Sequence, residues 1–278
     1  MIDLGKNIRM ERIVNRDSKR VLIVPLDHGV TMGPIPGIED IKRLIIEVVE
    51  GGATGVVMNK GMIAQGYRGY GKDVGLIMHL SASTILGPDA DAKVLVGSVE
   101  QAIKMGADGI AVHINVGADS ESEMLKDIGF ISEDCMDWRI PLFAMTYARG
   151  RKVKDHYDVD ALKHAARLGA ELGADMVTTN YTGNQDTFRE LVKSVPVPVL
   201  VTGGQKLRSD LEMLKIIKEC VDAGGAGAAI GRNIFQHESP YNMTRAISRI
   251  IFKGASVDEA TLELKKRGTI KGKKFKTV

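Results

Sequence analysis

Residues 198–232, PVLVTGGQKLRSDLEMLKIIKECVDAGGAGAAIGR, contain the repeating unit from which the fold can be inferred. An apolar run at 198–204 is followed by a segment whose apolar residues have helical spacing, and then by a second apolar run at 226–232. Ser209 stands where a helix N-cap is expected, and the glycines at 224–225 are typical of a helix end. Because both runs are hydrophobic almost throughout, they predict strands buried on both faces, as in a parallel sheet.

The same alternation extends along most of the chain and predicts the α/β class. Eight such units in about 230 residues are what a closed (β/α)8 barrel requires. An open doubly wound sheet is the alternative, but it usually carries a glycine-rich dinucleotide loop after the first strand, where this chain reads PLDHGV. We therefore predict a single (β/α)8 TIM barrel over residues 1–264, with an N-terminal helix at about 6–16 covering its bottom. The predicted strand runs are 21–27, 54–59, 75–80, 109–115, 141–147, 175–181, 198–204 and 226–232.

Composition and charge indicate a soluble globular protein. Apolar residues make up 44% and charged residues 26% of the 278 residues, the balance of a soluble protein with a large core. The net charge of +3 is concentrated in residues 265–278, which hold seven Lys or Arg and no acid, and we expect this basic tail to be flexible. No nucleic-acid recognition motif accompanies the tail, so no nucleic-acid partner is expected. Without a long uncharged apolar stretch or a signal-peptide core, the protein is expected in the cytoplasm, with no membrane partner.

The last two predicted strands end in glycine-rich loops, VTGGQK and AIGRN. Barrel enzymes frequently bind phosphate at the loops after these two strands, where glycine lets backbone N–H groups approach the anion. An arginine adds a side chain that can form paired hydrogen bonds with phosphate oxygens. The loops therefore predict a phosphate site, although tight turns alone would explain the same glycines. Its residues would be Gly203, Gly204, Gly231 and Arg232.

Two further strand ends carry groups suited to proton transfer. Asp27 follows the first apolar run, so its carboxyl group should face a cleft in which loss of solvent raises its pKa toward that of a general acid or base. Tyr147, at the end of the fifth run, has a phenol that could protonate a leaving oxygen. Each group could instead only hydrogen-bond to its neighbours, and strand position does not separate these two interpretations.

Three histidines, at the ends of the first, third and fourth runs, raise the alternative of zinc. Three imidazoles can hold a zinc ion that polarises a ketone as a Lewis acid. No close-spaced pair of ligands accompanies them, so we predict no metal and no other cofactor. We expect hydrogen-bonding roles in the barrel mouth for His28, His79 and His113.

Several motifs give a resemblance to a known family. PLDHGVTMGP, GYRGYGKDVGLIMHLSAST, HINVG, MTYARG, HAARLGAELGAD, NYTG, VTGG and AIGRNIFQ resemble the archaeal class I fructose-bisphosphate aldolases, with the nearest likeness to the branch of 2-amino-3,7-dideoxy-D-threo-hept-6-ulosonate synthases. The resemblance runs from about residue 5 to 250. It implies a (β/α)8 barrel, a lysine Schiff base on a phosphorylated keto sugar, and a homo-oligomer of up to ten chains. For that branch it implies a transaldol step onto L-aspartate semialdehyde, early in aromatic amino acid biosynthesis.

The resemblance also implies roles for individual residues. It makes Asp27 the acid/base group and Tyr147 the proton donor, and it places phosphate at the glycine loops and arginine already named. Further substrate contacts are implied for the two motifs that follow the first and fifth strands, namely for His28, Gly29, Val30, Thr31, Ala148 and Arg149.

One position departs from the family pattern. The imine-forming lysine should stand two residues before NYTG, where this chain has Thr178. Because a hydroxyl group cannot form an imine with a ketone, Schiff-base chemistry is expected to be lost or altered here. The chain could be a variant without its lysine, a natural relative with other chemistry, or an enzyme that uses Lys60 or Lys206 instead. The alternatives to the synthase activity are a fructose-bisphosphate aldolase and a catalytically silent sugar-phosphate binder.

Overall fold

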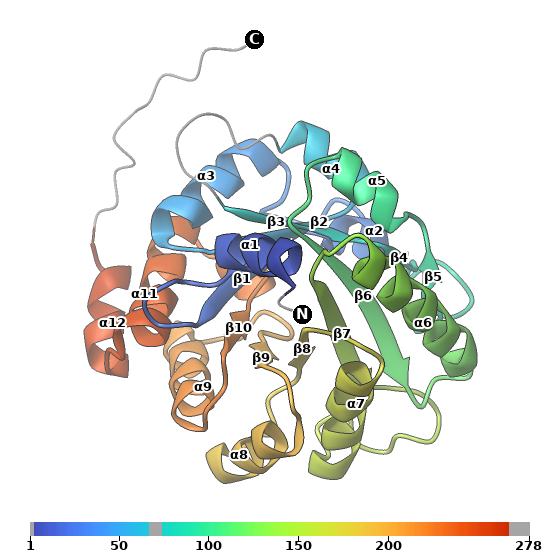
Figure 1. Cartoon of the computed structure of the whole chain (residues 1–278). Helices are drawn as coiled ribbons and strands as arrows, with labels where there is room; N and C mark the ends of the chain where they lie inside the picture. The colour runs from blue at the N-terminus through green and yellow to red at the C-terminus, as the bar shows by residue number, and fades with distance from the viewer. Residues whose placement is uncertain (1–2, 67–73, 267–278) are drawn as a thin grey trace.

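The computed structural model describes residues 3–66 and 74–266 of the chain. Within these residues, eight parallel strands close into a barrel in the order β1-β10-β9-β8-β7-β6-β3-β2 (Figure 1). Each of the eight predicted runs coincides with one of these strands, although β6 and β7 extend one residue beyond their runs. The predicted TIM barrel is therefore confirmed. The barrel strands are β1 (Val21–Pro25), β2 (Gly55–Met58), β3 (Gly75–His79), β6 (Gly109–Val116), β7 (Leu142–Ala148), β8 (Met176–Thr179), β9 (Val199–Thr202) and β10 (Gly227–Ala229).

Helices surround the barrel (Figure 1). The helical segment predicted between the runs at 198–204 and 226–232 corresponds to α9 (Asp210–Asp222), and α7 (Val159–Glu171) follows β7. Ser209 occupies the N-cap position of α9, as predicted, although its side chain makes no capping hydrogen bond. The other helices are α1 (Leu4–Ile13), α2 (His28–Met32), α3 (Ile41–Gly51), α4 (Lys60–Gln65), α5 (Val99–Lys104), α6 (Glu121–Asp137), α8 (Gln185–Ser194), α10 (Arg232–Phe235), α11 (Pro240–Lys253) and α12 (Val257–Leu264).

A short antiparallel hairpin that the sequence did not predict is inserted between β3 and β6. Its strands, β4 (Ser81–Ala82) and β5 (Val94–Leu95), are two residues long each. The amide of Ile85 in the connecting loop donates a hydrogen bond to the carbonyl oxygen of Thr31 at 3.1 Å. The hairpin therefore ties this loop to the segment that follows β1.

Side chains alternate between two apolar layers along each barrel strand. On β8, Met176 belongs to a cluster inside the barrel, whereas Val177 belongs to the larger cluster between strands and helices. The helix α1 closes the bottom of the barrel, as predicted, because its last residue, Ile13, is fully buried in the inner cluster. A Cβ atom at Gly75 would lie 2.5 Å from Cγ1 of Ile13, so glycine is needed there to admit the isoleucine.

Two sequence features fall partly outside the described residues. The motif GYRGYGKDVGLIMHLSAST includes residues 67–73, and the basic tail is described only at Lys265 and Lys266. None of the helices formed by the described residues is long and apolar enough to cross a membrane.

Replacing Ile13 by alanine should lower the free energy of unfolding by about 2–5 kcal/mol, because the closed barrel cannot collapse onto the cavity that is left. Urea denaturation followed by circular dichroism measures this loss. Ile85→Ala is the matched control, since the same atoms are removed from a side chain that is 58% exposed, and it should change stability by less than about 0.5 kcal/mol. Equal losses in the two variants would contradict the role of Ile13.

Candidate active site

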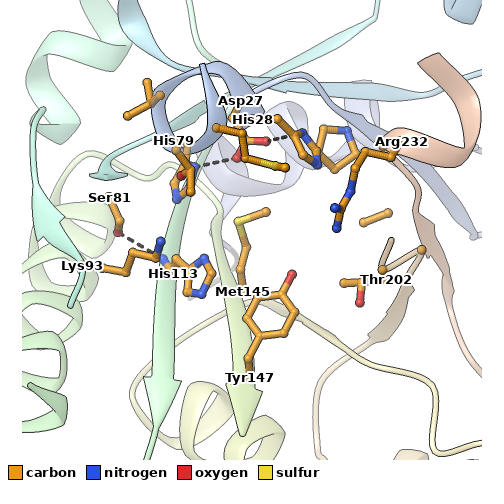
Figure 2. A pocket seen from close by; sticks show the side chains of 18 of the residues that line it. Asp27, His28, His79, Ser81, Lys93, His113, Met145, Tyr147, Thr202 and Arg232 are labelled. Atoms are coloured by element: carbon orange, nitrogen blue, oxygen red, sulfur yellow. Dashed lines mark hydrogen bonds and ion pairs between the residues drawn. The ribbon is translucent and has the colours of Figure 1, made fainter. Parts of the chain in front are cut away.

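A cavity of about 210 Å³ opens at the carboxyl ends of the barrel strands. Side chains from opposite sides of the barrel converge on it, as Figure 2 shows. Most of the residues predicted for the site line this cavity: Asp27, His28, Val30, Thr31, Tyr147, Arg149, Gly203, Gly204, Gly231 and Arg232.

Three predicted site residues do not form part of the cavity lining. Gly29 lies in the first turn of α2, beside residues that do. Ala148 is buried in the layer between strands and helices, and its carbonyl oxygen accepts a hydrogen bond from Nδ1 of His156 at 2.8 Å. Thr178 has the same orientation on β8 as Met176 and Asn180, so its side chain faces the barrel interior, next to the cavity that Asn180 lines.

The carboxylate of Asp27 is held between two histidines (Figure 2). Oδ2 accepts a hydrogen bond from Nδ1 of His79 at 2.6 Å, and Oδ1 lies 3.5 Å from Nδ1 of His28. Burial alone would raise the pKa of Asp27, but the hydrogen bond and the charge of His79, together with His28, lower it to about 2. The sequence-based expectation of a raised pKa was therefore wrong, because the neighbouring histidines outweigh the loss of solvent.

Tyr147 lies across the cavity from Asp27 and is packed between two side chains. Its ring is 4.7 Å from the imidazole of His113, and the guanidinium of Arg149 lies 4.7 Å above the ring. Burial raises the pKa of Tyr147, and the opposing effect of the Arg149 charge is smaller. The phenol therefore keeps its proton at neutral pH and is available as a donor.

Thr178 is 3% exposed, and its neighbours in the sheet are Met145 of β7 and Leu200 of β9. Its Oγ1 atom has no hydrogen-bond partner among the described residues. A buried hydroxyl without a partner is unusual, and a substrate oxygen in the adjacent cavity would supply one.

The predicted phosphate loops form one end of the cavity. Gly204 has φ of +59°, a left-handed conformation that favours glycine, and a Cβ atom there would meet only open space. Among the described residues, the backbone N–H groups of Gly204 and Gly231 have no acceptor. Nε of Arg232 is also without one. This end of the cavity therefore presents several unused donors, as an anion site requires.

Asn233 fixes the shape of the loop after β9, and the sequence did not reveal this role. Its Nδ2 donates to the carbonyl oxygens of Gly203 and Gln205 at 2.9 Å each, and its Oδ1 accepts from the amide of Leu207 at 2.8 Å. A side chain that bonds to backbone atoms about thirty residues away leaves no periodic signal in a sequence.

The two lysines suggested as replacements for the missing amine lie elsewhere. Nζ of Lys60 donates to the carbonyl oxygen of Val96 at 2.6 Å, and Lys206 is exposed 3.8 Å from Asp210, so neither lines the cavity. The lysine that does is Lys93, which precedes β5 and was missed because two-residue strands are too short to detect.

The three histidines do not converge as the zinc alternative requires. His79 and His113 are stacked with ring centroids 6.5 Å apart, whereas His28 faces the other oxygen of Asp27. Within residues 3–66 and 74–266, no three His, Cys, Asp or Glu side chains are grouped so that they could hold a metal ion. Burial lowers the pKa of His113 well below its usual value, so this ring is neutral at pH 7.

Comparison with known proteins identifies the family. Residues 21–237 match the family described as DeoC/LacD family aldolase. This chain belongs to that family. The resemblance recognised in the sequence is thereby confirmed, and the protein is an aldolase-family enzyme.

Curated relatives of this aldolase-family enzyme extend over nearly its whole length. A 2-amino-3,7-dideoxy-D-threo-hept-6-ulosonate synthase of Halobacterium salinarum is 41% identical over 260 residues, which cover 94% of this chain and 96% of the relative. A 2-amino-4,5-dihydroxy-6-oxo-7-(phosphonooxy)heptanoate synthase of Streptomyces griseus is 37% identical over 247 residues, which cover 89% of this chain and 90% of the relative.

Solved structures of aldolases share the barrel. An archaeal fructose 1,6-bisphosphate aldolase is similar with a TM-score of 0.83 and 31% identity, over 90% of this chain and all of that one. An archaeal aldolase structure described as having its catalytic lysine covalently bound to the carbinolamine intermediate has a TM-score of 0.83 and 30% identity, over 89% and 99% of the two chains.

Replacing Arg232 by alanine should weaken the binding of dihydroxyacetone phosphate by about 1.5–3 kcal/mol, the range for a hydrogen bond to a charged group. This corresponds to a roughly ten- to hundredfold rise in the dissociation constant measured by calorimetry. Arg245→Ala, which removes an exposed arginine from α11, is the control and should bind like the native protein. Unchanged affinity in the Arg232 variant would contradict a phosphate site at these loops.

Proposed function

We propose that this enzyme makes or breaks a carbon–carbon bond near the ketone of a phosphorylated keto sugar, in a reaction most similar to that of the synthases among its relatives. The observation that carries the proposal is the convergence of Asp27, Tyr147 and the phosphate loops on one cavity. The 41% identity to a synthase, against 31% to a fructose-bisphosphate aldolase, favours the transaldol step onto L-aspartate semialdehyde over bisphosphate cleavage.

The two proton-transfer groups have complementary states in this proposal. Asp27 is ionised and can accept the proton of a substrate hydroxyl, while Tyr147 is protonated and can donate to a substrate oxygen. A carboxylate whose pKa is about 2 is, however, a weak base. Its reaction with substrate therefore depends strongly on how well the ketone is activated.

Activation of the ketone is the step in which Thr178 matters. An imine between lysine and ketone withdraws electrons from the breaking bond, and the hydroxyl of Thr178 cannot form one. The hydroxyls of Thr178 and Tyr147 can only hydrogen-bond to the carbonyl oxygen. We therefore propose that the native chain binds its substrate but turns it over several orders of magnitude more slowly than a lysine-bearing relative.

We also propose that the chain forms a homo-oligomer. Large exposed apolar side chains lie on α1 (Leu4, Ile8), on α6 (Phe130) and at the residue that directly follows α6 (Trp138). These helices adjoin, since Nη1 of Arg9 donates to the carbonyl oxygen of Arg139, two residues after α6 ends, at 3.1 Å. Exposed apolar patches of this kind mark association surfaces. Sedimentation equilibrium should give a mass several times 30.1 kDa, and a monomer at micromolar concentration would contradict the proposal.

Replacing Thr178 by lysine should raise aldol or transaldol activity by several orders of magnitude. The barrel mouth would desolvate the new amine and lower its pKa, which frees the nucleophilic neutral form. The measurement is steady-state cleavage of fructose 1,6-bisphosphate and formation of the heptulosonate from L-aspartate semialdehyde, for native and variant proteins side by side.

Thr202→Lys is the matched control, because it places an amine at the end of the adjacent strand β9, in the same cavity. It should add little activity, since a misplacement of about 1 Å can cost about a hundredfold in rate. If the native protein already turns over at about 1–10³ per second and lysine at 178 adds nothing, the proposed role of this position is wrong.

A further inference from the structure

Lys93 is a buried cation that none of the roles proposed so far uses. Its side chain is 7% exposed and lines the cavity, on the side opposite Arg232 (Figure 2). The ammonium group donates a hydrogen bond to Oγ of Ser83. Among the described residues this is its one hydrogen bond, and no carboxylate lies within ion-pair distance of it.

The ammonium group of Lys93 can therefore form further hydrogen bonds, and these could be made with an anion. The group carries three N–H donors, and a charge taken out of water is costly unless it is paired and hydrogen-bonded. Burial and the nearby Arg149 charge lower the pKa of Lys93, against the opposing effect of Asp91. A negatively charged group entering the cavity would offset both unfavourable effects.

Arg149 and Asp91 complete a small charged cluster with Lys93. Nη1 of Arg149 lies 3.9 Å from Oδ1 of Asp91, too far for a hydrogen bond, and both side chains are 38% exposed. The cluster therefore contains two cations and one anion, none of them tightly paired. This arrangement matches an α-amino carboxylate, whose carboxylate would face the two cations that line the cavity. Its ammonium would lie toward Asp91, which adjoins Arg149 outside the lining.

The order of groups along the cavity supports this match. Arg232 and the phosphate loops lie at one end, Asp27 and Tyr147 lie between, and Lys93 lies at the other end (Figure 2). The Streptomyces griseus relative is named for a product with a phosphate ester on C7, a ketone at C6, an amino group at C2 and a carboxylate at C1. The product therefore has its phosphate, its ketone and its amino-acid end in the same order as the phosphate loops, the proton-transfer groups and Lys93 along the cavity.

We infer that Lys93, Arg149 and Asp91 form an amino-acid subsite, which binds the α-amino carboxylate end of an elongated substrate or product. The surrounding charges favour a carboxylate over a second phosphate, because the carboxylates of Asp91, Asp27 and Asp89 all act on Lys93 besides Arg149. This limited excess of positive charge suits a monoanion rather than a group that approaches two negative charges at neutral pH. The inference rests on the proposed function for what occupies the opposite end of the cavity.

The experiment compares three probes on native protein and variants. L-2-aminobutyrate tests the whole amino-acid group, L-2-aminobutyramide has the same shape without the carboxylate, and inorganic phosphate tests the other end. Ligand-observed saturation-transfer NMR follows the first two, and phosphorus NMR titration follows the third. The variants are Lys93→Met, Arg232→Ala and, as the matched control, Lys104→Met, which removes an exposed lysine of α5.

Lys93→Met should weaken the binding of L-2-aminobutyrate at least tenfold and leave that of inorganic phosphate within about twofold, which also shows that the variant is folded. Arg232→Ala should do the reverse, and Lys104→Met should change neither. In the native protein the amide probe should bind at least tenfold more weakly than the carboxylate.

Three results would overturn the inference: equal binding of the carboxylate and the amide, undiminished binding of L-2-aminobutyrate to Lys93→Met, or a second phosphate per chain that this variant loses. Borohydride reduction in the presence of dihydroxyacetone phosphate that adds mass to the Lys93 peptide would also overturn it, by showing a nucleophile instead of a binding cation. If the native protein does not bind inorganic phosphate but binds L-2-aminobutyrate in a way that depends on Lys93, the result would contradict the proposed function and support the subsite.

Discussion

The site depends on how a carboxylate is kept ionised at the bottom of a barrel mouth. The side chain of Asp27 is only 9% exposed, and a carboxylate withdrawn from water is unfavourable unless its charge is compensated. His79 and His28, from different parts of the chain, supply that compensation on its two oxygens. The hydrogen bond to Asp27 also fixes the orientation of the His79 ring. That ring stacks on His113, and the His113 ring packs against Tyr147. The position of Tyr147, across the cavity, therefore depends on the contacts that neutralise the charge of Asp27.

Charge is distributed unevenly along the cavity, and this distribution determines what can bind. The phosphate loops offer unpaired N–H groups and Arg232 at one end, and Lys93 with Arg149 offers cations at the other. Between them, the carboxylate of Asp27 and the neutral phenol of Tyr147 face the cavity, and the hydroxyl of Thr178 lies next to it. A ligand with anions at both ends and a neutral ketone between them is complementary to this pattern. The absence of an amine at position 178 does not disturb it, since binding and covalent activation depend on different residues.

Sequence patterns predicted the strands and most of the residues that line the candidate site, because a parallel barrel brings all its strand ends to one mouth. Asp27, Tyr147 and the glycine loops follow apolar runs directly, so their approximate positions follow from the fold class. The position of Lys93 could not be inferred in this way, because the hairpin that carries it has strands of only two residues, too short to show an alternation of apolar and polar residues. The direction of the pKa shift of Asp27 was also beyond the sequence, since it depends on contact with a histidine 52 residues away. Proximity of two strand ends does not reveal which of their side chains hydrogen-bond.

Carbon NMR of dihydroxyacetone phosphate labelled at the carbonyl carbon tests the central claim most directly, because it observes the ketone itself in the bound state. With native protein in excess, we expect the labelled carbon to broaden on binding but to keep the signals of a free ketone and its hydrate. Addition of inorganic phosphate should restore the sharp lines by competition. Appearance of an imine, carbinolamine or enamine signal would show that a lysine of this chain forms the covalent adduct, and would contradict the account of Thr178.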